Sequence, residues 1–230
     1  MIAIVIFSLL LFAFAVLFMR ERIRGYSKKD LILKTIAAIC CVVVGVCAYV
    51  LHPTPLGAAL LLGGATGAVG DISLGLSHVQ KEKRHAFTKG GFLFFGLGHL
   101  VYIGGLLSAY LSSAIYWLLP LLIGIGIGAG MGMFGRRFGL HFGRYLPFVI
   151  YYVSVLTSGV GIALGLNLMS GFSNPQLRLF LVGMILFMIS DSILSRTYFS
   201  KGGKSPAAVI ANHVTYYGAQ YLIAVSILFV

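Results

Sequence analysis

The sequence is short of charged residues, and of acidic residues above all. Only five of its 230 residues are Asp or Glu, and all charged residues together make up 10% of the chain. Soluble domains carry roughly a quarter of their residues as charged side chains, because these cover the surface that faces water. Here hydrophobic residues make up 59%, and the mean hydropathy is +1.00. These values exclude an ordinary soluble domain and predict a chain that lipid largely covers.

Motifs of metal, phosphate and serine-nucleophile chemistry are also missing. The three cysteines, Cys40, Cys41 and Cys47, fall in one apolar stretch without the spacing of a metal site or a disulfide framework, so we interpret them as packing residues. The sequence has no HExxH motif, and we expect no metal site. Its glycines lie inside apolar runs and no Walker-type lysine follows them, so they predict close helix packing.

The basic residues indicate a membrane orientation and no nucleic-acid partner. The formal net charge is +12, but the basic residues lie in short loops between apolar runs. Sixteen of the 17 Lys and Arg residues flank four alternate loops, from Arg20–Lys34 to Arg196–Lys204, and only Arg178 lies on the other face. Basic residues gather on the cytoplasmic side of membrane proteins. We therefore expect both termini to be extracytoplasmic, in a bacterial cytoplasmic membrane.

Eight apolar runs predict an all-α integral membrane protein, a bundle of about eight transmembrane helices in one domain of residues 1–230. Each run is close to the roughly 20 residues that cross the hydrocarbon core of a bilayer. The runs lie near residues 2–19, 31–51, 56–76, 89–111, 115–134, 146–167, 177–196 and 207–229. The first has no basic segment before it, so we expect a retained helix rather than a signal peptide. Pro147, Pro175 and Pro206 predict helix starts, and Ser205 predicts a helix cap.

Two aspartates inside the apolar runs are the most informative residues. Asp71 and Asp191 each lie about one to one and a half turns before the cytoplasmic end of a predicted helix. A carboxylate at such a depth costs several kcal/mol, so it usually faces the bundle interior and marks function. The alternative is an interhelical hydrogen bond or a side chain that reaches the interface. Glu21, Asp30 and Glu82 lie in the basic loops, where we expect solvated surface charges.

Other polar residues of the apolar runs are candidates for positioning a substrate or water near this pair. His213, Tyr216, Tyr217 and Gln220 recur at helical spacing and form one polar stripe. The predicted positioning residues are His99, Tyr102, Tyr152, Ser192, His213, Tyr217 and Gln220. A lone buried histidine is more often a packing residue than a ligand, and both interpretations stay open for His99 and His213. His78, His85 and His141 are expected to have no special role.

A weak internal repeat relates the two halves of the chain, about residues 1–111 and 112–230. Gly70-Asp71-Ile72-Ser73-Leu74 resembles Ser190-Asp191-Ser192-Ile193-Leu194, and His99-x-x-Tyr102 resembles His213-x-x-Tyr216. Four helices in each half predict two repeats of the same orientation, which would bring two half-sites together. Both aspartates lie to the cytoplasmic side of the predicted midplane, so we expect the site to open toward the cytoplasmic leaflet.

Two buried carboxyl groups are typical of acid–base catalysis. Burial favours the neutral form of a carboxyl group, and a like charge nearby favours it further. One group can then hold a proton while the other is ionised, as in the enzymes that cleave acetals through an oxocarbenium ion. This chemistry suits hydrolysis of a lipid ether or acetal. A metal-dependent intramembrane hydrolase and a transporter or lipid-translocating protein are the alternatives, because Asp and His also ligate zinc and transporters also bury acids.

The order and spacing of these motifs resemble those of the YhhN-type integral membrane proteins, whose animal members are lysoplasmalogenases. The resemblance covers roughly residues 30–229, and His213 is less clearly part of the pattern. It is carried by Gly70-Asp71 with Leu74, by Phe92 through Phe95-Gly96 to Gly98-His99-x-x-Tyr102, by Ser190-Asp191-x-x-Leu194 and by Tyr217-x-Ala219-Gln220.

The resemblance implies an ether hydrolase without a cofactor. Its substrate would be a lysophospholipid taken from membrane lipid, lysoplasmenyl-ethanolamine or lysoplasmenyl-choline, and its products a fatty aldehyde and a glycerophospho-base. One of Asp71 and Asp191 would protonate the vinyl β-carbon. The other would stabilise the oxocarbenium ion or deprotonate the attacking water. His99, Tyr102, Tyr217 and Gln220 would orient water or the head group.

Overall fold

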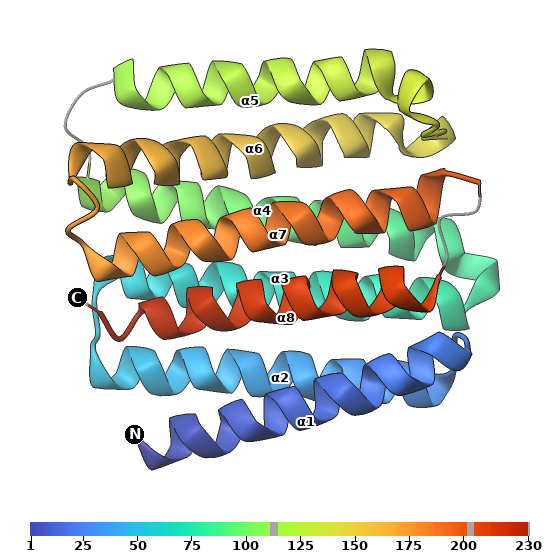
Figure 1. Ribbon diagram of the computed structural model, residues 1–230, viewed down its shortest axis with the longest axis horizontal. Helices are drawn as coiled ribbons and strands as arrows, with labels where there is room; N and C mark the ends of the chain where they lie inside the picture. Colours follow the sequence, from blue (N-terminus) through green and yellow to red (C-terminus); the bar gives the residue numbers. More distant parts are fainter. Residues whose placement is uncertain (111–114, 202–204, 230) are drawn as a thin grey trace.

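The computed structural model describes residues 1–110, 115–201 and 205–229, and in these residues it contains eight long helices that run alternately up and down (Figure 1). Their bounds are α1 Ile2–Arg24, α2 Lys28–Leu51, α3 Pro55–Val79, α4 Arg84–Tyr110, α5 Ile115–Phe134, α6 Leu146–Met169, α7 Pro175–Phe199 and α8 Pro206–Ser226. Short 3₁₀ turns at Lys81–Lys83, Gly135–Phe138 and Gly143–Tyr145 join some of them. The predicted bundle of about eight helices is confirmed.

Seven of the eight helices are long and apolar enough to cross a membrane, so the chain is a multi-pass membrane protein. The eighth, α8, falls short of that apolarity because it carries the polar stripe that includes Asn212, His213 and Gln220. The predicted end of the fourth run at residue 111 and the basic residue Lys204 lie outside the described residues. Helix α1 begins and α8 ends at the same end of the bundle (Figure 1). Which end faces the cytoplasm stays a prediction.

Local sequence signals set where the helices begin. The side chains of Ser27, Thr54, Asn174 and Ser205 each accept a hydrogen bond from a backbone N–H three residues further on. Such caps satisfy amides that have no partner within the helix. Proline stands in the first turn of α3, α6, α7 and α8, where its missing N–H costs nothing. The cap predicted at Ser205 is therefore confirmed.

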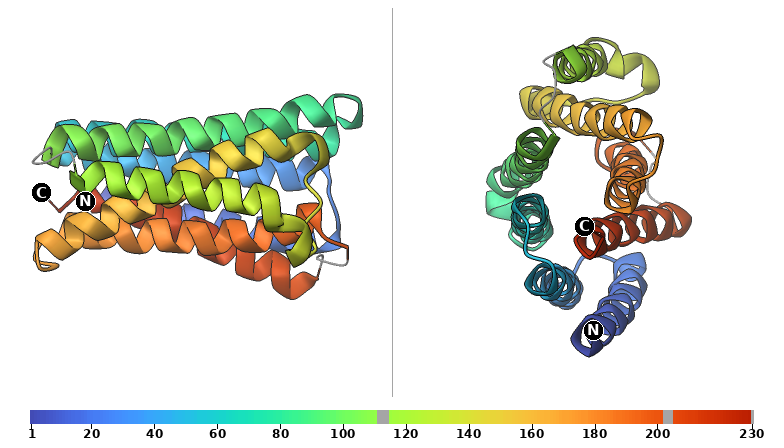
Figure 2. Two further views of the ribbon diagram at one scale, coloured as in Figure 1. Left: turned by 90° about the horizontal axis from the view of Figure 1, so that it is seen from above. Right: turned by 90° about the vertical axis from the view of Figure 1, so that its left-hand side faces the viewer.

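Six helices form a closed ring, and the other two lie outside it. Around the ring the neighbours are α2, α3, α4, α6, α7 and α8, with α8 returning to α2 (Figure 2). Helix α1 packs outside on α2 and α8, and α5 packs outside on α6. The neighbours of α2–α3–α4 thus correspond in order to those of α6–α7–α8. This is the arrangement that a parallel repeat requires, although the repeat stays a prediction and its boundary at 111/112 lies outside the described residues.

One face of α5 consists of glycines that allow close contact with α6. A Cβ atom added at Gly124 would lie 2.1 Å from the Oγ of Ser158, and one added at Gly128 would lie 2.1 Å from the Oγ of Ser154. On the opposite face, a Cβ atom at Gly126 would meet nothing within 4 Å. The predicted packing role of these glycines therefore applies to the face that meets α6.

This packing predicts opposite outcomes for two neighbouring glycine substitutions. The Cβ of Gly128→Ala would also lie 2.7 Å from the carbonyl oxygen of Ile150, which cannot move without distorting α6. Overpacking of this kind should lower the free energy of unfolding by about 1–3 kcal/mol. Gly126→Ala is the matched control and should be neutral or slightly stabilising. Denaturant unfolding in mixed micelles measures both, and equal stability of the two variants would contradict the packing described.

Candidate active site

A cavity of about 250 Å³ opens inside the ring and is lined by both buried aspartates. Asp71 reaches it from α3 and Asp191 from α7. Lys34 of α2, Tyr152 of α6 and His213 of α8 line the same cavity, so five of the six ring helices contribute a polar side chain. The two aspartates that the sequence singled out thus share one cavity.

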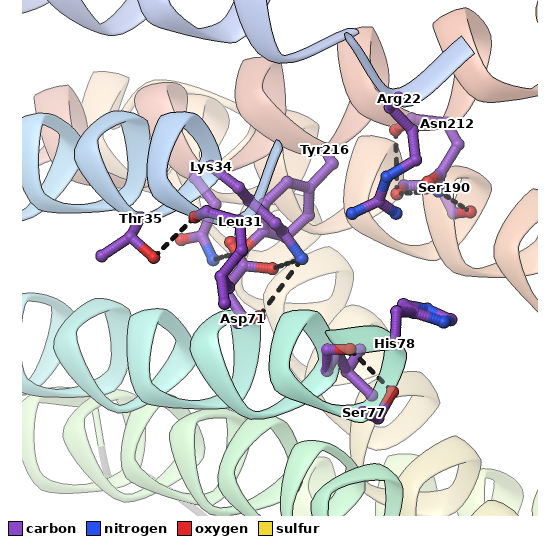
Figure 3. Close-up of polar contacts among 12 residues, drawn as sticks. Arg22, Leu31, Lys34, Thr35, Asp71, Ser77, His78, Ser190, Asn212 and Tyr216 are labelled. Atoms are coloured by element: carbon purple, nitrogen blue, oxygen red, sulfur yellow. Dashed lines mark hydrogen bonds and ion pairs between the residues drawn. The ribbon is translucent and has the colours of Figure 1, made fainter. Parts of the chain in front are cut away.

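Asp71 is held by two donors on different helices. The Nζ of Lys34 lies 2.6 Å from its Oδ1, and the hydroxyl of Tyr216 donates a 2.7 Å hydrogen bond to its Oδ2 (Figure 3). The Nε2 of Gln220 in turn donates to the Tyr216 hydroxyl at 3.1 Å. Asp71 and Lys34 are only 3% and 7% exposed. Asp71 is therefore a carboxylate whose charge is neutralised inside the bundle.

A glycine allows α2 to come close enough for this ion pair. A Cβ atom at Gly75 would lie 2.4 Å from the Cδ1 of Leu31, so any larger residue would force the Leu31 side chain to move. Gly75 is one turn beyond Asp71 on α3, and Leu31 is one turn before Lys34 on α2. Helices α2 and α3 therefore pack closely at Gly75, one turn from the Lys34–Asp71 ion pair.

Asp191 is placed differently. It is only partly buried, and its Oδ2 accepts a hydrogen bond from the hydroxyl of Tyr152. Within residues 1–110, 115–201 and 205–229, no ion pair involves Asp191. Just before it, the Nδ2 of Asn212 donates to the carbonyl and hydroxyl oxygens of Ser190, at 2.7 and 2.9 Å, which joins α7 to α8. Asp191 therefore lines the cavity from a helix that hydrogen bonds hold to α8, and it lacks an ion-pair partner such as Lys34 provides for Asp71.

Some of the predicted positioning residues lie away from the cavity. His99 is 2% exposed and stands behind Tyr152, with its Nε2 3.5 Å from the Tyr152 hydroxyl. The ring of Tyr102 packs edge-on against Phe180 at 5.6 Å and serves the core. Ser192 does line the cavity, but its hydroxyl donates to the carbonyl of Met188, on its own helix.

Two further predicted residues, Tyr217 and Gln220, line a second, much smaller cavity of about 20 Å³. It lies among α2, α3 and α8 and also reaches Asp71. The buried hydroxyl of Tyr217 has no hydrogen-bond partner among the described residues. The hydroxyl on Asp71 belongs instead to Tyr216, the neighbouring member of the predicted stripe.

The expectation that the acidic residues of the first loop are solvated is wrong for Asp30. Its side chain is 2% exposed and forms an ion pair with Arg22, whose Nε lies 2.6 Å from Oδ2. Lys34, counted above among the loop residues that set orientation, is likewise buried. The sequence held a signal for Lys34, since it lies inside the predicted run 31–51, as the two aspartates lie inside theirs.

His78, which was expected to have no special role, also lines the cavity. Its Nε2 lies 2.6 Å from the hydroxyl of Tyr198, and its ring stacks on Tyr26 with 3.7 Å between ring centroids. The guanidinium of Arg22 lies 4.4 Å from the centroid of the same Tyr26 ring. Together with Lys34, these side chains make the side of the cavity next to α1, α2 and α3 polar and partly cationic.

The arrangement suits proton transfer. It offers a neutralised carboxylate, a second carboxyl without a cation and a tyrosine hydroxyl in contact with that second carboxyl. Among the described residues, no three His, Cys, Asp or Glu side chains lie close enough together to hold a metal ion.

The chain was compared with known proteins, and the model of the YhhN family matches residues 30–227. No curated protein and no solved structure matches the chain.

The ion pair predicts a strong dependence of stability on Lys34. Lys34→Met would leave the Asp71 carboxylate buried without its counter-charge, which should cost about 3–5 kcal/mol of unfolding free energy. The double variant Lys34→Met/Asp71→Asn removes the orphaned charge and should recover most of the loss. Denaturant unfolding measures the three proteins. A single Lys34→Met variant as stable as the wild type would show that the pair is absent.

The neighbouring tyrosines of α8 predict unequal effects. Tyr216→Phe removes the donor to Asp71 and the acceptor of Gln220, so we expect a loss of about 1–3 kcal/mol. Tyr217→Phe removes a hydroxyl that has no partner among the described residues, so its effect should stay within about 0.5 kcal/mol. The same unfolding measurement compares them, and a larger loss for Tyr217→Phe would reverse the assignment.

Proposed function

The chain belongs to the YhhN family, and from this membership and the two unequal carboxyl groups we propose that it hydrolyses the vinyl ether bond of a lysoplasmalogen. The products would be a fatty aldehyde and a glycerophospho-base. The family match supports a hydrolase of this kind. The difference between Asp71 and Asp191 supports the specific chemistry and assigns a role to each carboxyl group.

The observation that carries the proposal is that only one of the two aspartates has a cation. Asp71 is neutralised by Lys34 at 2.6 Å, whereas no described cation pairs with Asp191. An unpaired carboxylate inside a membrane protein is costly, and a proton is the simplest way to neutralise it. We therefore assign Asp191 as the general acid that holds the proton, and Asp71 as the permanent carboxylate.

The reaction begins with proton transfer to carbon. Asp191 gives its proton to the vinyl β-carbon, and the electron pair of the double bond forms the new C–H bond. The α-carbon becomes part of an oxocarbenium ion, which the negative charge of Asp71 and the newly formed carboxylate of Asp191 stabilise. Water then attacks the α-carbon while Asp191 takes its proton, which restores the acid.

The hemiacetal formed in this way then collapses. The bond between the α-carbon and the glycerol oxygen breaks, the glycerol oxygen takes the hydroxyl proton of the hemiacetal, and the carbonyl of the aldehyde forms. Tyr152 would hold the Asp191 carboxyl in position through its hydrogen bond, and His99 would orient Tyr152 from behind. We place the head group at the end of the cavity that carries Lys34 and His78, toward the cytoplasmic leaflet.

The direct test uses purified protein in detergent with lysoplasmenyl-ethanolamine and lysoplasmenyl-choline, and detects the aldehyde. Asp191→Asn should lower the rate by about 10²–10⁴-fold, the usual contribution of a general acid. The double variant Lys34→Met/Asp71→Asn, which keeps the buried charges balanced, should lose activity as well. Glu82→Gln is the matched control, because Glu82 is an exposed loop acid.

The same assay in D₂O tests the first step. Protonation at carbon places one deuterium on the carbon next to the aldehyde carbonyl, which mass spectrometry detects. Aldehyde without this deuterium would contradict the mechanism, and loss of activity with a chelator would favour the metal-dependent alternative. No aldehyde from folded protein with either head group would contradict the function and turn attention to transport.

A further inference from the structure

The cavity that holds the two aspartates has an apolar end. Beyond Asp191 it is lined by Ile127 and Met131 of α5, by Val153 and Leu156 of α6, and by Met188 of α7. Three hydroxyl groups also line the cavity, and the shortest hydrogen bond that each donates is to a carbonyl of its own helix. Thr157 donates to the carbonyl of Val153 at 2.7 Å, Ser192 to that of Met188 at 2.8 Å and Ser195 to that of Ser192 at 2.9 Å. Beyond Asp191 the lining is therefore mainly apolar and carries no charged side chain.

The apolar end opens beside α6, at the outer surface of the bundle. Helix α5 packs along α6, and no extensive contact joins α5 to α7 among the described residues (Figure 2). Residues of both α5 and α7 nevertheless line the cavity. Ile127, at its edge, is 45% exposed, and Ser192 is exposed as well. The opening lies within the span of apolar helices, where the surroundings are lipid chains rather than water.

The polar and apolar ends meet at Asp191. Asp191 lies on α7, which packs between α6, whose Val153 and Leu156 line the apolar end, and α8, which contributes the polar His213. A ligand that fits this order has a hydrocarbon chain at one end, a polar head at the other and its reacting bond between them.

We propose that the apolar end between α5, α6 and α7 binds the hydrocarbon chain of a single-chain lipid, which enters sideways from the membrane. The volume of about 250 Å³ lies just below the roughly 300–1,000 Å³ of ordinary ligand sites, which favours one chain over two. The identity of the head group rests on the proposed function, but the position of the chain rests on the lining residues alone. Ile127 at the edge of the opening is then a specificity-determining residue.

The test uses a saturated 1-O-alkyl lysophosphoethanolamine that carries a diazirine at the end of its chain. This lipid has no vinyl ether, so it is bound without being hydrolysed. After irradiation of the wild-type protein in detergent, peptide mapping should find the label on α5 and α6 near Ile127, Met131 and Val153. An excess of unlabelled single-chain lipid should suppress labelling more strongly than an equal excess of two-chain lipid.

Two matched variants on α5 locate the chain. Ile127→Trp fills the opening and should weaken labelling roughly tenfold, the effect of overpacking one apolar contact. Ile125→Trp, at an exposed position that does not line the cavity, should leave labelling unchanged. Label outside α5–α7, an equal effect of both variants, or equal competition by two-chain lipid would overturn the inference. Correct labelling without any vinyl ether hydrolysis would leave the chain site standing and reject the proposed function.

Discussion

An ion pair between Lys34 and Asp71, buried inside the helical bundle, is the interaction on which the rest of the site depends. Two opposite charges placed 2.6 Å apart between α2 and α3 neutralise each other where water is scarce. A second buried pair, Arg22 with Asp30, uses a further cation and anion in the same way. Once both pairs have formed, Asp191 is the one carboxyl lining the cavity that has no ion-pair partner in the described part of the chain. The two aspartates lie in similar sequence motifs, but only Asp71 has an ion-pair partner, so their chemical properties differ.

Close helix packing makes this pairing feasible. Gly75 lets α2 approach α3 beside the ion pair, and Gly124 and Gly128 let α5 lie directly on α6. The ring of six helices then leaves a cavity in its interior, while α5 stays outside and extends the cavity toward lipid. Small residues thus hold neighbouring helices of this fold in close contact.

Much of the fold follows from the sequence because its signals are local. Apolar runs of about 20 residues, prolines in the first turns and a serine cap predict helices that begin within a few residues of the observed starts. The sequence also identifies the two aspartates as candidate site residues, since a charged residue in an apolar run is rare and usually functional. Lys34 is harder to predict as a site residue, because a lysine near a helix end usually lies at the interface between membrane and water. Its partner lies 37 residues away, and only the tertiary structure brings the two together. Tyr216 and Tyr217 belong to one stripe, and periodicity alone cannot select which hydroxyl reaches Asp71.

The central claim is that Asp191, and not Asp71, holds a proton in the resting protein. Infrared spectroscopy of the protein in lipid at neutral pH tests it directly, because a protonated carboxyl group absorbs apart from a carboxylate. A protonated-carboxyl band in the wild type should disappear in Asp191→Asn and persist in Lys34→Met/Asp71→Asn, with Glu82→Gln as the control. Absence of the band from the wild type, or its loss in the Asp71 variant alone, would contradict the assignment of the acid.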